Sequence, residues 1–223
     1  MAAGPLPLGL RNRLAELILD AFESGEARAT LAALGGALRK DGGTVDPADA
    51  DRLLRLGWFE SVEAGQVKLL RAHRAYGPVL GDRAGRATSV VDGWQDRGHD
   101  GMVRLLRRAA ALANHGLFFE VHELLEPAWF RAADPVRTAL QGLIQVAVAF
   151  HHLENGNHQG ARSLLTEGVA KVAGGAAALP LDTNGWLGEL RAALATLVAE
   201  KTPAVIPGWP SPALDEEIRW RSC

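Results

Sequence analysis

Two residue types that exchange protons and bind metal ions recur at helical spacing between residues 117 and 153. His122 and Glu126 are four positions apart, so in a helix they lie one turn apart on the same face. Glu123 lies at the border of this face, which also carries large apolar side chains: Phe118, Val121, Leu125 and Trp129. The opposite side is expected to face solvent and carries Glu120, Pro127 and Arg131. A histidine and a carboxylate among apolar neighbours need partners, because burying an unpaired charge is costly.

The next segment, residues 136–153, offers such partners. It is apolar almost all round except for a single polar stripe formed by Arg137, Gln141, Gln145 and His152. The short connection between the two segments favours antiparallel helices whose polar residues face each other. The sequence therefore predicts one buried cluster, with Glu123 at its edge and five members: His122, Glu126, Gln141, Gln145 and His152.

Three interpretations of this cluster remain open, and the first is favoured. The network fixes the register of two helices; or it binds a divalent metal ion through His122, Glu126 and His152; or it binds a small organic ligand. In the metal case Glu123 would act as proton acceptor in a hydrolytic reaction. The region has too few carboxylates for a di-iron site, and Glu126 stands where the zinc-protease pattern needs its second histidine.

The composition limits the classes of protein to which this chain can belong. Lys and Arg number 24 against 26 Asp and Glu, a net charge of -2, so the positive excess of a dedicated nucleic-acid binder is missing. No apolar run reaches the roughly 20 residues of a membrane span, and the first ten residues do not resemble a secretory signal. The single cysteine, Cys223, has no partner within the chain. We expect a soluble cytoplasmic protein without membrane association.

The elements that position the cluster form a mainly all-α C-terminal bundle over residues 101–202. Apolar periodicity predicts five antiparallel helices, at about 102–114, 117–130, 136–153, 158–172 and 182–201. Asp134 and Asn157 are expected to cap two of them, and Gly142 to let a neighbouring helix approach closely. Pro127 predicts a kink, because proline has no N–H to donate to the Glu123 carbonyl. The Pro-rich tail, 203–223, is expected to lie extended across the bundle surface or to be partly loose.

The N-terminal residues 1–80 predict a small helical accessory domain, joined to the bundle by a linker over residues 81–100, where Gly81, Gly85, Gly93 and Gly98 interrupt any long helical period. Helices are expected at 10–23, 27–40 and 46–57, followed by a β-hairpin turning at Glu63-Ala64-Gly65. This order is winged-helix-like and raises the alternative of a DNA-binding regulator acting through residues 27–70. Twelve basic against eleven acidic residues over 1–86, with Asp46, Asp49 and Asp51 opening the third helix, make that alternative unfavourable.

Three motifs in the bundle, in order, resemble one known family. They are FFEVHELLEPAW (118–129), QGLIQVAVAFHH (141–152) and GNHQGARSLL (156–165). Over about residues 100–205 the chain resembles the bacterial and archaeal domain of unknown function 309 family. The resemblance implies a compact all-helical bundle and no established activity, and Pro127 departs from the helix-forming residue usual at its position in that family.

The sequence leaves open whether the chain is an enzyme. It has no phosphate-binding glycine loop, no nucleophile elbow and no catalytic cysteine. A non-catalytic binding or interaction module, with a protein partner or a second copy of the chain, is therefore the favoured function. A metal-dependent hydrolase using His122, Glu126 and His152 is the alternative.

Overall fold

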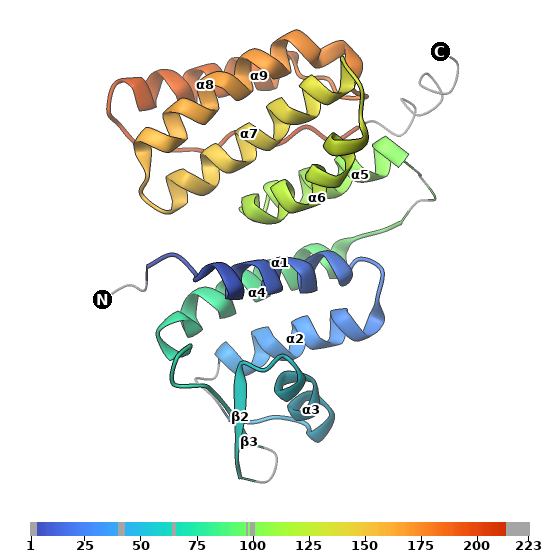
Figure 1. The fold of residues 1–223 in the computed structure, drawn as a ribbon, viewed down its shortest axis with the longest axis vertical. Coiled ribbons are helices and arrows are strands. Elements are labelled where there is room, and N and C mark those ends of the chain that lie inside the picture. The colour runs from blue at the N-terminus through green and yellow to red at the C-terminus, as the bar shows by residue number, and fades with distance from the viewer. Residues whose placement is uncertain (1–3, 40–42, 64–65, 97, 99–100, 213–223) are drawn as a thin grey trace. The chain divides into compact units, whose positions relative to one another are not determined.

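The structure is a computed structural model that describes residues 4–39, 43–63, 66–96, 98 and 101–212. It divides into two compact units, Met1–Gln95 and Asp96–Cys223, which are described separately. Both are mainly helical, which confirms the predicted fold class (Figure 1). No helix in the described ranges is both long and apolar enough to cross a membrane.

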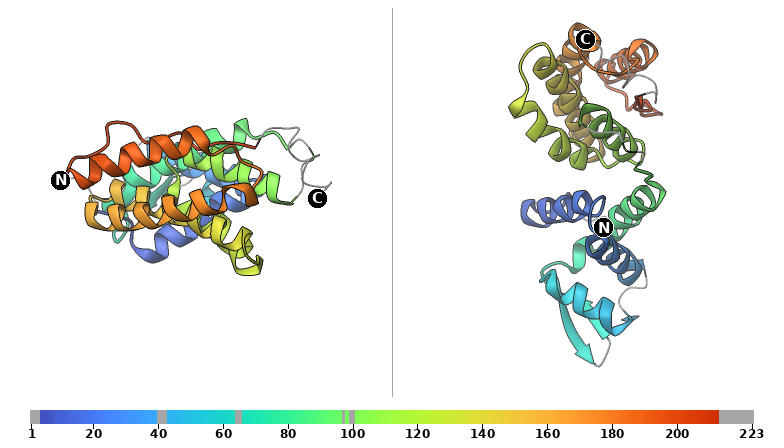
Figure 2. Two further views of the ribbon diagram at one scale, coloured as in Figure 1. Left: turned by 90° about the horizontal axis from the view of Figure 1, so that it is seen from above. Right: turned by 90° about the vertical axis from the view of Figure 1, so that its right-hand side faces the viewer.

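The first unit combines helices with a small antiparallel sheet. Its helices are α1 (Leu8–Asp20), α2 (Gly25–Arg39), α3 (Pro47–Arg55), the short η1 (Arg74–Tyr76) and α4 (Gly77–Gly93). The strands β1 (Gly43–Thr44), β2 (Phe59–Glu63) and β3 (Gln66–Leu69) pair in the order β1-β3-β2. Phe59 pairs with Leu69 and Ser61 with Val67, and the hairpin extends away from the helices of this unit (Figure 2). The winged-helix-like order is confirmed, although the two-residue β1 was too short to predict.

The third helix, α3, lies within the range predicted for it, 46–57. The Asp46 carboxylate accepts a hydrogen bond from the Ala48 N–H at 2.9 Å, and Pro47 is the first helical residue. Gly57 adopts a φ of 71°, a left-handed conformation that costs glycine little. Residues Ala64 and Gly65 of the predicted turn lie outside the described residues.

Helix α4 occupies most of the segment expected to be a linker, so that prediction is wrong over residues 81–93. Five apolar residues of α4 are buried: Leu80, Ala84, Ala87, Val90 and Val91. Two of the glycines in this segment, Gly81 and Gly85, lie at the contact with α2: a Cβ on Gly81 would come within 2.9 Å of the Leu38 Cβ, and one on Gly35 of α2 within 3.5 Å of the Gly85 nitrogen. Close packing here outweighs the roughly 1 kcal/mol that each helical glycine costs. The unit boundary consequently follows Gln95 rather than residue 80.

The second unit is the predicted helical bundle. Its elements are α5 (Gly101–Ala113), α6 (Phe118–Arg131), α7 (Val136–Glu154), α8 (His158–Gly175), the short η2 (Ala176–Ala178) and α9 (Asn184–Val198). The bounds of its α-helices agree with the sequence prediction to within about three residues, which is the usual uncertainty at helix ends. Helix α7 lies between α6 and α8, as its apolar character predicted (Figure 1).

Small residues bring α7 and α8 into close contact. A Cβ on Gly142 would lie 2.8 Å from the Val172 backbone nitrogen, and one on Gly168 would lie 3.0 Å from the Gly142 carbonyl oxygen. The predicted joint is confirmed, because Gly156 has a φ of 73° and the Asn157 side chain accepts a hydrogen bond from the Gly160 N–H at 2.9 Å. The close approach predicted at Gly142 is therefore made with α8.

The tail is attached to the bundle at Trp209. The Trp209 backbone N–H donates to the Asn114 side-chain oxygen at 2.7 Å, and the Asn114 amide donates back to the Trp209 backbone carbonyl at 3.2 Å. The Trp209 and Trp186 rings lie 5.2 Å apart, and Trp209 is buried. The expected extended tail is present up to Pro212, whereas Trp220 and Cys223 lie outside the described residues.

Candidate functional site

The predicted polar residues of α6 form a small group that we call the His122 cluster: His122, Glu123 and Glu126. The His122 Nδ1 lies 3.1 Å from a Glu123 carboxylate oxygen, and its Nε2 lies 3.9 Å from a Glu126 carboxylate oxygen. Their side chains are 25%, 30% and 41% exposed, respectively. The cluster therefore lies at the edge of the bundle, in contact with solvent, and not in the buried position that the sequence predicted.

Gln145 faces a different helix from the one predicted. Its amide donates to a Glu167 carboxylate oxygen at 2.7 Å, and its carbonyl oxygen accepts from the Lys171 ammonium at 2.9 Å, so both partners belong to α8. The reason is the close α7–α8 packing at Gly142 and Gly168, which turns the polar stripe toward α8. Gln141, one turn earlier, is half-buried and makes no side-chain hydrogen bond within the described part of the chain.

His152 lies at the α7–α8 joint. Its Nδ1 is 3.0 Å from the Asn157 side-chain nitrogen. Burial, and secondarily the nearby His151, lowers the pKa of His152 below its ordinary value, so the imidazole is neutral at pH 7. The predicted metal set of His122, Glu126 and His152 is not assembled. Among the described residues, no three His, Cys, Asp or Glu side chains are grouped so as to hold a metal ion.

An aromatic contact that sequence reasoning missed connects α6 and α7. The Phe119 ring lies 5.8 Å from the His122 ring and 5.6 Å from the His151 ring, so the two histidines flank it. The His151 side chain is only 13% exposed and lies 3.9 Å from a Glu154 carboxylate oxygen. The i, i+3 spacing of Phe119 and His122 was the available signal, but the partner on α7 depends on tertiary packing.

Glu120 is fully buried, which corrects the prediction that it lies on the solvent side of α6. A helical wheel with one apolar arc assigns a helix a single buried face. Helix α6 packs against α5 as well as α7, and so it has a second covered side. Helix α6 continues through Pro127, the position of the predicted kink, to Arg131.

An open apolar groove of about 640 Å³ runs along the surface of α5 and α6 up to the start of α7. Its walls are mainly apolar and include Met102, Leu105, Leu124, Pro127, Ala128 and Val136. We call it the bundle groove. Its volume is within the range of sites that bind ligands. Arg131 also lines it, and the neighbouring Phe130 is 63% exposed. Periodicity could not reveal this groove, because it arises from three segments that meet in the folded unit.

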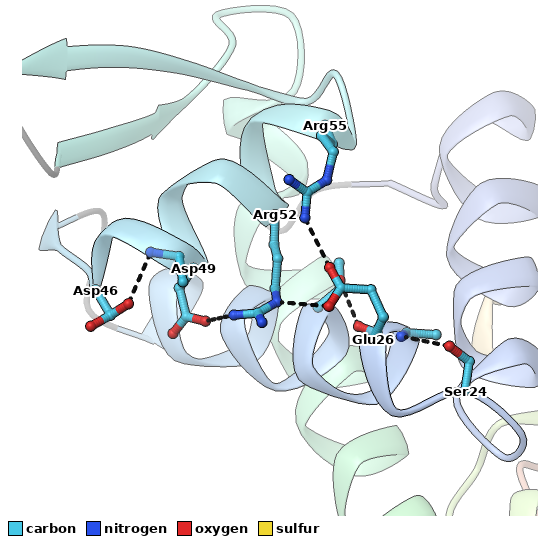
Figure 3. Close-up of polar contacts among 9 residues, drawn as sticks. Ser24, Glu26, Asp46, Asp49, Arg52 and Arg55 are labelled. Atoms are coloured by element: carbon cyan, nitrogen blue, oxygen red, sulfur yellow. Dashed lines mark hydrogen bonds and ion pairs between the residues drawn. The ribbon is translucent and has the colours of Figure 1, made fainter.

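Helix α3 stands where a winged helix has its DNA-recognition helix, and the positive charges of its arginines are neutralised by ion pairs. The Glu26 carboxylate of α2 forms ion pairs with the Arg55 guanidinium at 2.8 Å and with the Arg52 Nε at 3.4 Å (Figure 3). Arg52 also donates a hydrogen bond to Asp49 at 2.9 Å. These contacts, the Asp49 hydrogen bond first, raise the pKa of Arg52 above its usual range. The two arginines of α3 are thus already paired with carboxylates, and little positive charge remains for phosphates.

Comparison with known proteins confirms the resemblance of the bundle. The family model Domain of unknown function (DUF309) matches residues 106–164, which include α6, α7 and the start of α8. An uncharacterised protein of Aquifex aeolicus (strain VF5) is 30% identical over 99 residues. That stretch covers 44% of this chain and 28% of the Aquifex protein, so the two share one part of their lengths. No solved structure matches the chain.

Proposed function

We propose that this chain is a cytoplasmic, non-catalytic interaction module whose bundle binds a second copy of the chain. In this complex Phe130 of each copy enters the bundle groove of the other. The observation that carries the proposal is an exposed aromatic side chain beside an open apolar groove: Phe130 is 63% exposed, and its neighbour Arg131 lines the groove. An exposed apolar patch of this kind is typical of an interaction surface.

A projecting ring next to a groove favours a symmetric pair. In a twofold dimer the same patch is used by both copies, so each supplies one ring and one groove. The Phe130 ring lies against Trp129 at 4.8 Å, and the Trp129 ring lies 5.2 Å from the Arg137 guanidinium. These contacts restrict the base of the projecting ring, which reduces the entropy that binding must overcome.

The placement of the polar residues supports a binding role over a catalytic one. Gln145 is engaged with α8, His152 lies at the α7–α8 joint, and the His122 cluster contains three side chains of a single helix. A hydrolytic site needs an acid, a base and a substrate-binding group that converge on one point. The ion-paired arginines of α3 likewise favour a protein partner over nucleic acid.

The expected dimer is weak, because one ring and one groove are smaller than a standard stable interface. Burying the exposed part of each Phe130 is worth about 1–2 kcal/mol, or about 2–4 kcal/mol for the two rings. Since about 1.4 kcal/mol corresponds to a tenfold change, Phe130→Ser weakens the dimer by roughly 30- to 1000-fold.

Sedimentation equilibrium of the full chain, from low to several hundred micromolar, tests this proposal. Wild type is expected to dimerise in the micromolar range. Phe130→Ser, and Ala128→Arg, which places a charge in the groove, are each expected to dimerise at least about 30-fold more weakly. Val198→Ser is the matched control, because Val198 is 59% exposed on α9 and distant in sequence from the groove. A monomeric wild type, or equal weakening by Val198→Ser, contradicts the proposal. The double variant is expected to be no weaker than the more damaging single variant, because ring and groove form one contact.

A further inference from the structure

Given the self-association proposed above, on which this pairing rests, we infer that the two copies meet through antiparallel α6 helices. Arg131 of each copy pairs with Glu123 of the other. The contact lies on the side of α6 centred on Pro127, which is exposed and lines the bundle groove. We call this side the Pro127 face, and it comprises Glu123, Leu124, Pro127, Phe130 and Arg131.

The spacing of these residues makes the Pro127 face complementary to itself. Residues three and four positions apart are neighbours on one side of a helix. Glu123 and Leu124 precede Pro127 by four and three positions, and Phe130 and Arg131 follow it by three and four. When two copies of α6 lie antiparallel about a twofold axis at Pro127, each position before the proline meets the equivalent position after it in the other copy. Glu123 then meets Arg131, and Leu124 meets Phe130.

Neither charged residue of the Pro127 face has a Lys, Arg, Asp or Glu partner within the described part of the chain. Arg131 is exposed, and its side chain makes no ion pair or hydrogen bond with a described residue. The Glu123 side chain is 30% exposed, and its carboxylate contacts the His122 imidazole of the same helix at 3.1 Å. A guanidinium can bind a carboxylate through two parallel N–H donors. The chain thus presents an unpaired cation and an accessible carboxylate at matching distances on either side of Pro127.

Pro127 adds a further acceptor beside the Glu123 carboxylate. Helix α6 continues through Pro127, and proline has no N–H to donate to the carbonyl four residues earlier, which is that of Glu123. A helical carbonyl points toward the residue four positions on, so this oxygen lies on the side of the exposed Pro127. The Arg131 guanidinium has several N–H donors and is suited to an acceptor of this kind as well as to the carboxylate.

The apolar residues of the face require the same orientation as the charged ones. Leu124 lines the bundle groove, and Phe130 is 63% exposed. The register that pairs Glu123 with Arg131 also sets each Phe130 ring opposite Leu124 of the other copy. A parallel pairing would instead bring identical residues together, so that Glu123 would face Glu123 and Arg131 would face Arg131. Like charges in contact are repulsive, which selects the antiparallel arrangement.

Charge reversal at the two positions, measured by sedimentation equilibrium of the full chain, tests this pairing. Glu123→Arg and Arg131→Glu each replace two attractive contacts of the dimer by two repulsive ones. Each variant alone is expected to self-associate at least about tenfold more weakly than wild type. An equal mixture of the two variants is expected to associate at least about tenfold more tightly than either variant alone, because both contacts of the mixed dimer again join opposite charges. This recovery also shows that both variants are folded.

Charge reversals on α9 are the matched control. Glu189→Arg and Arg191→Glu alter exposed positions and change the net charge of the chain by the same amounts. Neither variant nor their mixture is expected to change the association constant by more than about twofold, since charges outside the contact interact weakly.

The results separate this pairing from the self-association on which it rests. A dimeric wild type that Phe130→Ser weakens, but whose affinity neither Glu123→Arg nor Arg131→Glu changes, would refute the pairing and leave the self-association standing. A mixture of the two charge reversals that associates no more tightly than each variant alone would refute the pairing as well. A wild type that stays monomeric would refute both.

Discussion

Replacing Gly142 by alanine tests the close packing of α7 on α8, which turns the polar stripe of α7 toward α8. A Cβ at this position would lie 2.8 Å from the Val172 backbone nitrogen, 2.9 Å from the Val172 Cγ2 and 3.0 Å from the Lys171 Cβ. Because two of these atoms belong to backbone or to the first side-chain carbon, the neighbour can only yield by moving the helix. Overpacking of this kind costs about 1–3 kcal/mol.

The alanine also brings a benefit that must be subtracted. In a helix interior alanine is about 1 kcal/mol more favourable than glycine. Since the clash involves backbone on both sides, we expect the upper part of the overpacking range and a net destabilisation of about 1–2 kcal/mol. At roughly 4 °C per kcal/mol, the Tm of the bundle falls by about 4–8 °C.

Gly188→Ala is the matched control. Gly188 lies in the interior of α9, is exposed, and a Cβ there would meet nothing within 4 Å. Its replacement should therefore stabilise the chain by about 0.5–1 kcal/mol. Urea denaturation followed by far-UV circular dichroism measures both variants. If Gly142→Ala is as stabilising as Gly188→Ala, the two helices are not in the described contact and the reasoning is wrong.

Three further predictions concern the polar residues and the tail. A double-mutant cycle of Gln145→Ala with Glu167→Ala, measured by urea denaturation, is expected to give a coupling free energy of about 0.5–1 kcal/mol, because Gln145 contacts Glu167 at 2.7 Å. The cycle of Gln145→Ala with His122→Ala is expected to give none. Coupling between Gln145 and His122 instead would restore the predicted cluster. The pKa of His152 is lowered in the folded state by burial, so below its ordinary value the unfolded chain binds the proton more readily. The contribution of His152 to the free energy of unfolding is therefore complete above the ordinary histidine pKa and is lost as the pH falls from there through the lower folded-state pKa. His152→Gln should flatten this dependence of stability on pH. A histidine NMR titration in which the pKa of His152 is unshifted or raised would contradict the prediction. Trp209→Ala removes a buried ring and is expected to destabilise the bundle by about 2–4 kcal/mol and to speed cleavage between residues 201 and 209 in limited proteolysis; unchanged cleavage would show that the ring does not hold the tail.

The sequence was sufficient to predict the helices of the bundle, because their order and limits depend on local signals. The apolar period of α7, the Asn157 cap and the left-handed Gly156 are all readable along the chain. Which neighbouring helix a given helix face contacts depends instead on tertiary packing, and local signals do not determine it. Gln145 faces α8 because Gly142 and Gly168 allow close approach, and the same glycine was visible in the sequence without its partner.

Glycine was also the reason for the error at α4. Gly81 and Gly85 interrupt the apolar period and predicted a linker, yet both lie in a helix whose contact with α2 needs small residues. Local propensity and tertiary packing oppose each other at such positions, and packing prevails when enough apolar surface is buried. Glu120 shows the same limit, since a helix covered on two sides has no single solvent face. The bundle groove is formed by segments that are distant in sequence and could not be predicted from spacing.

The proposed self-association is tested most directly by the position of the Phe130 ring in a mixed dimer. The chain has two methionines, of which Met102 lines the bundle groove, so its methyl signal is readily assigned. A sample that mixes methyl-labelled chains with chains labelled on phenylalanine is examined for intermolecular nuclear Overhauser effects at high concentration. The proposal predicts an effect between the Phe130 ring of one copy and the Met102 methyl group of the other, which disappears in Ala128→Arg. A dimer with intermolecular effects only at other residues, or no intermolecular effect at all, would contradict it.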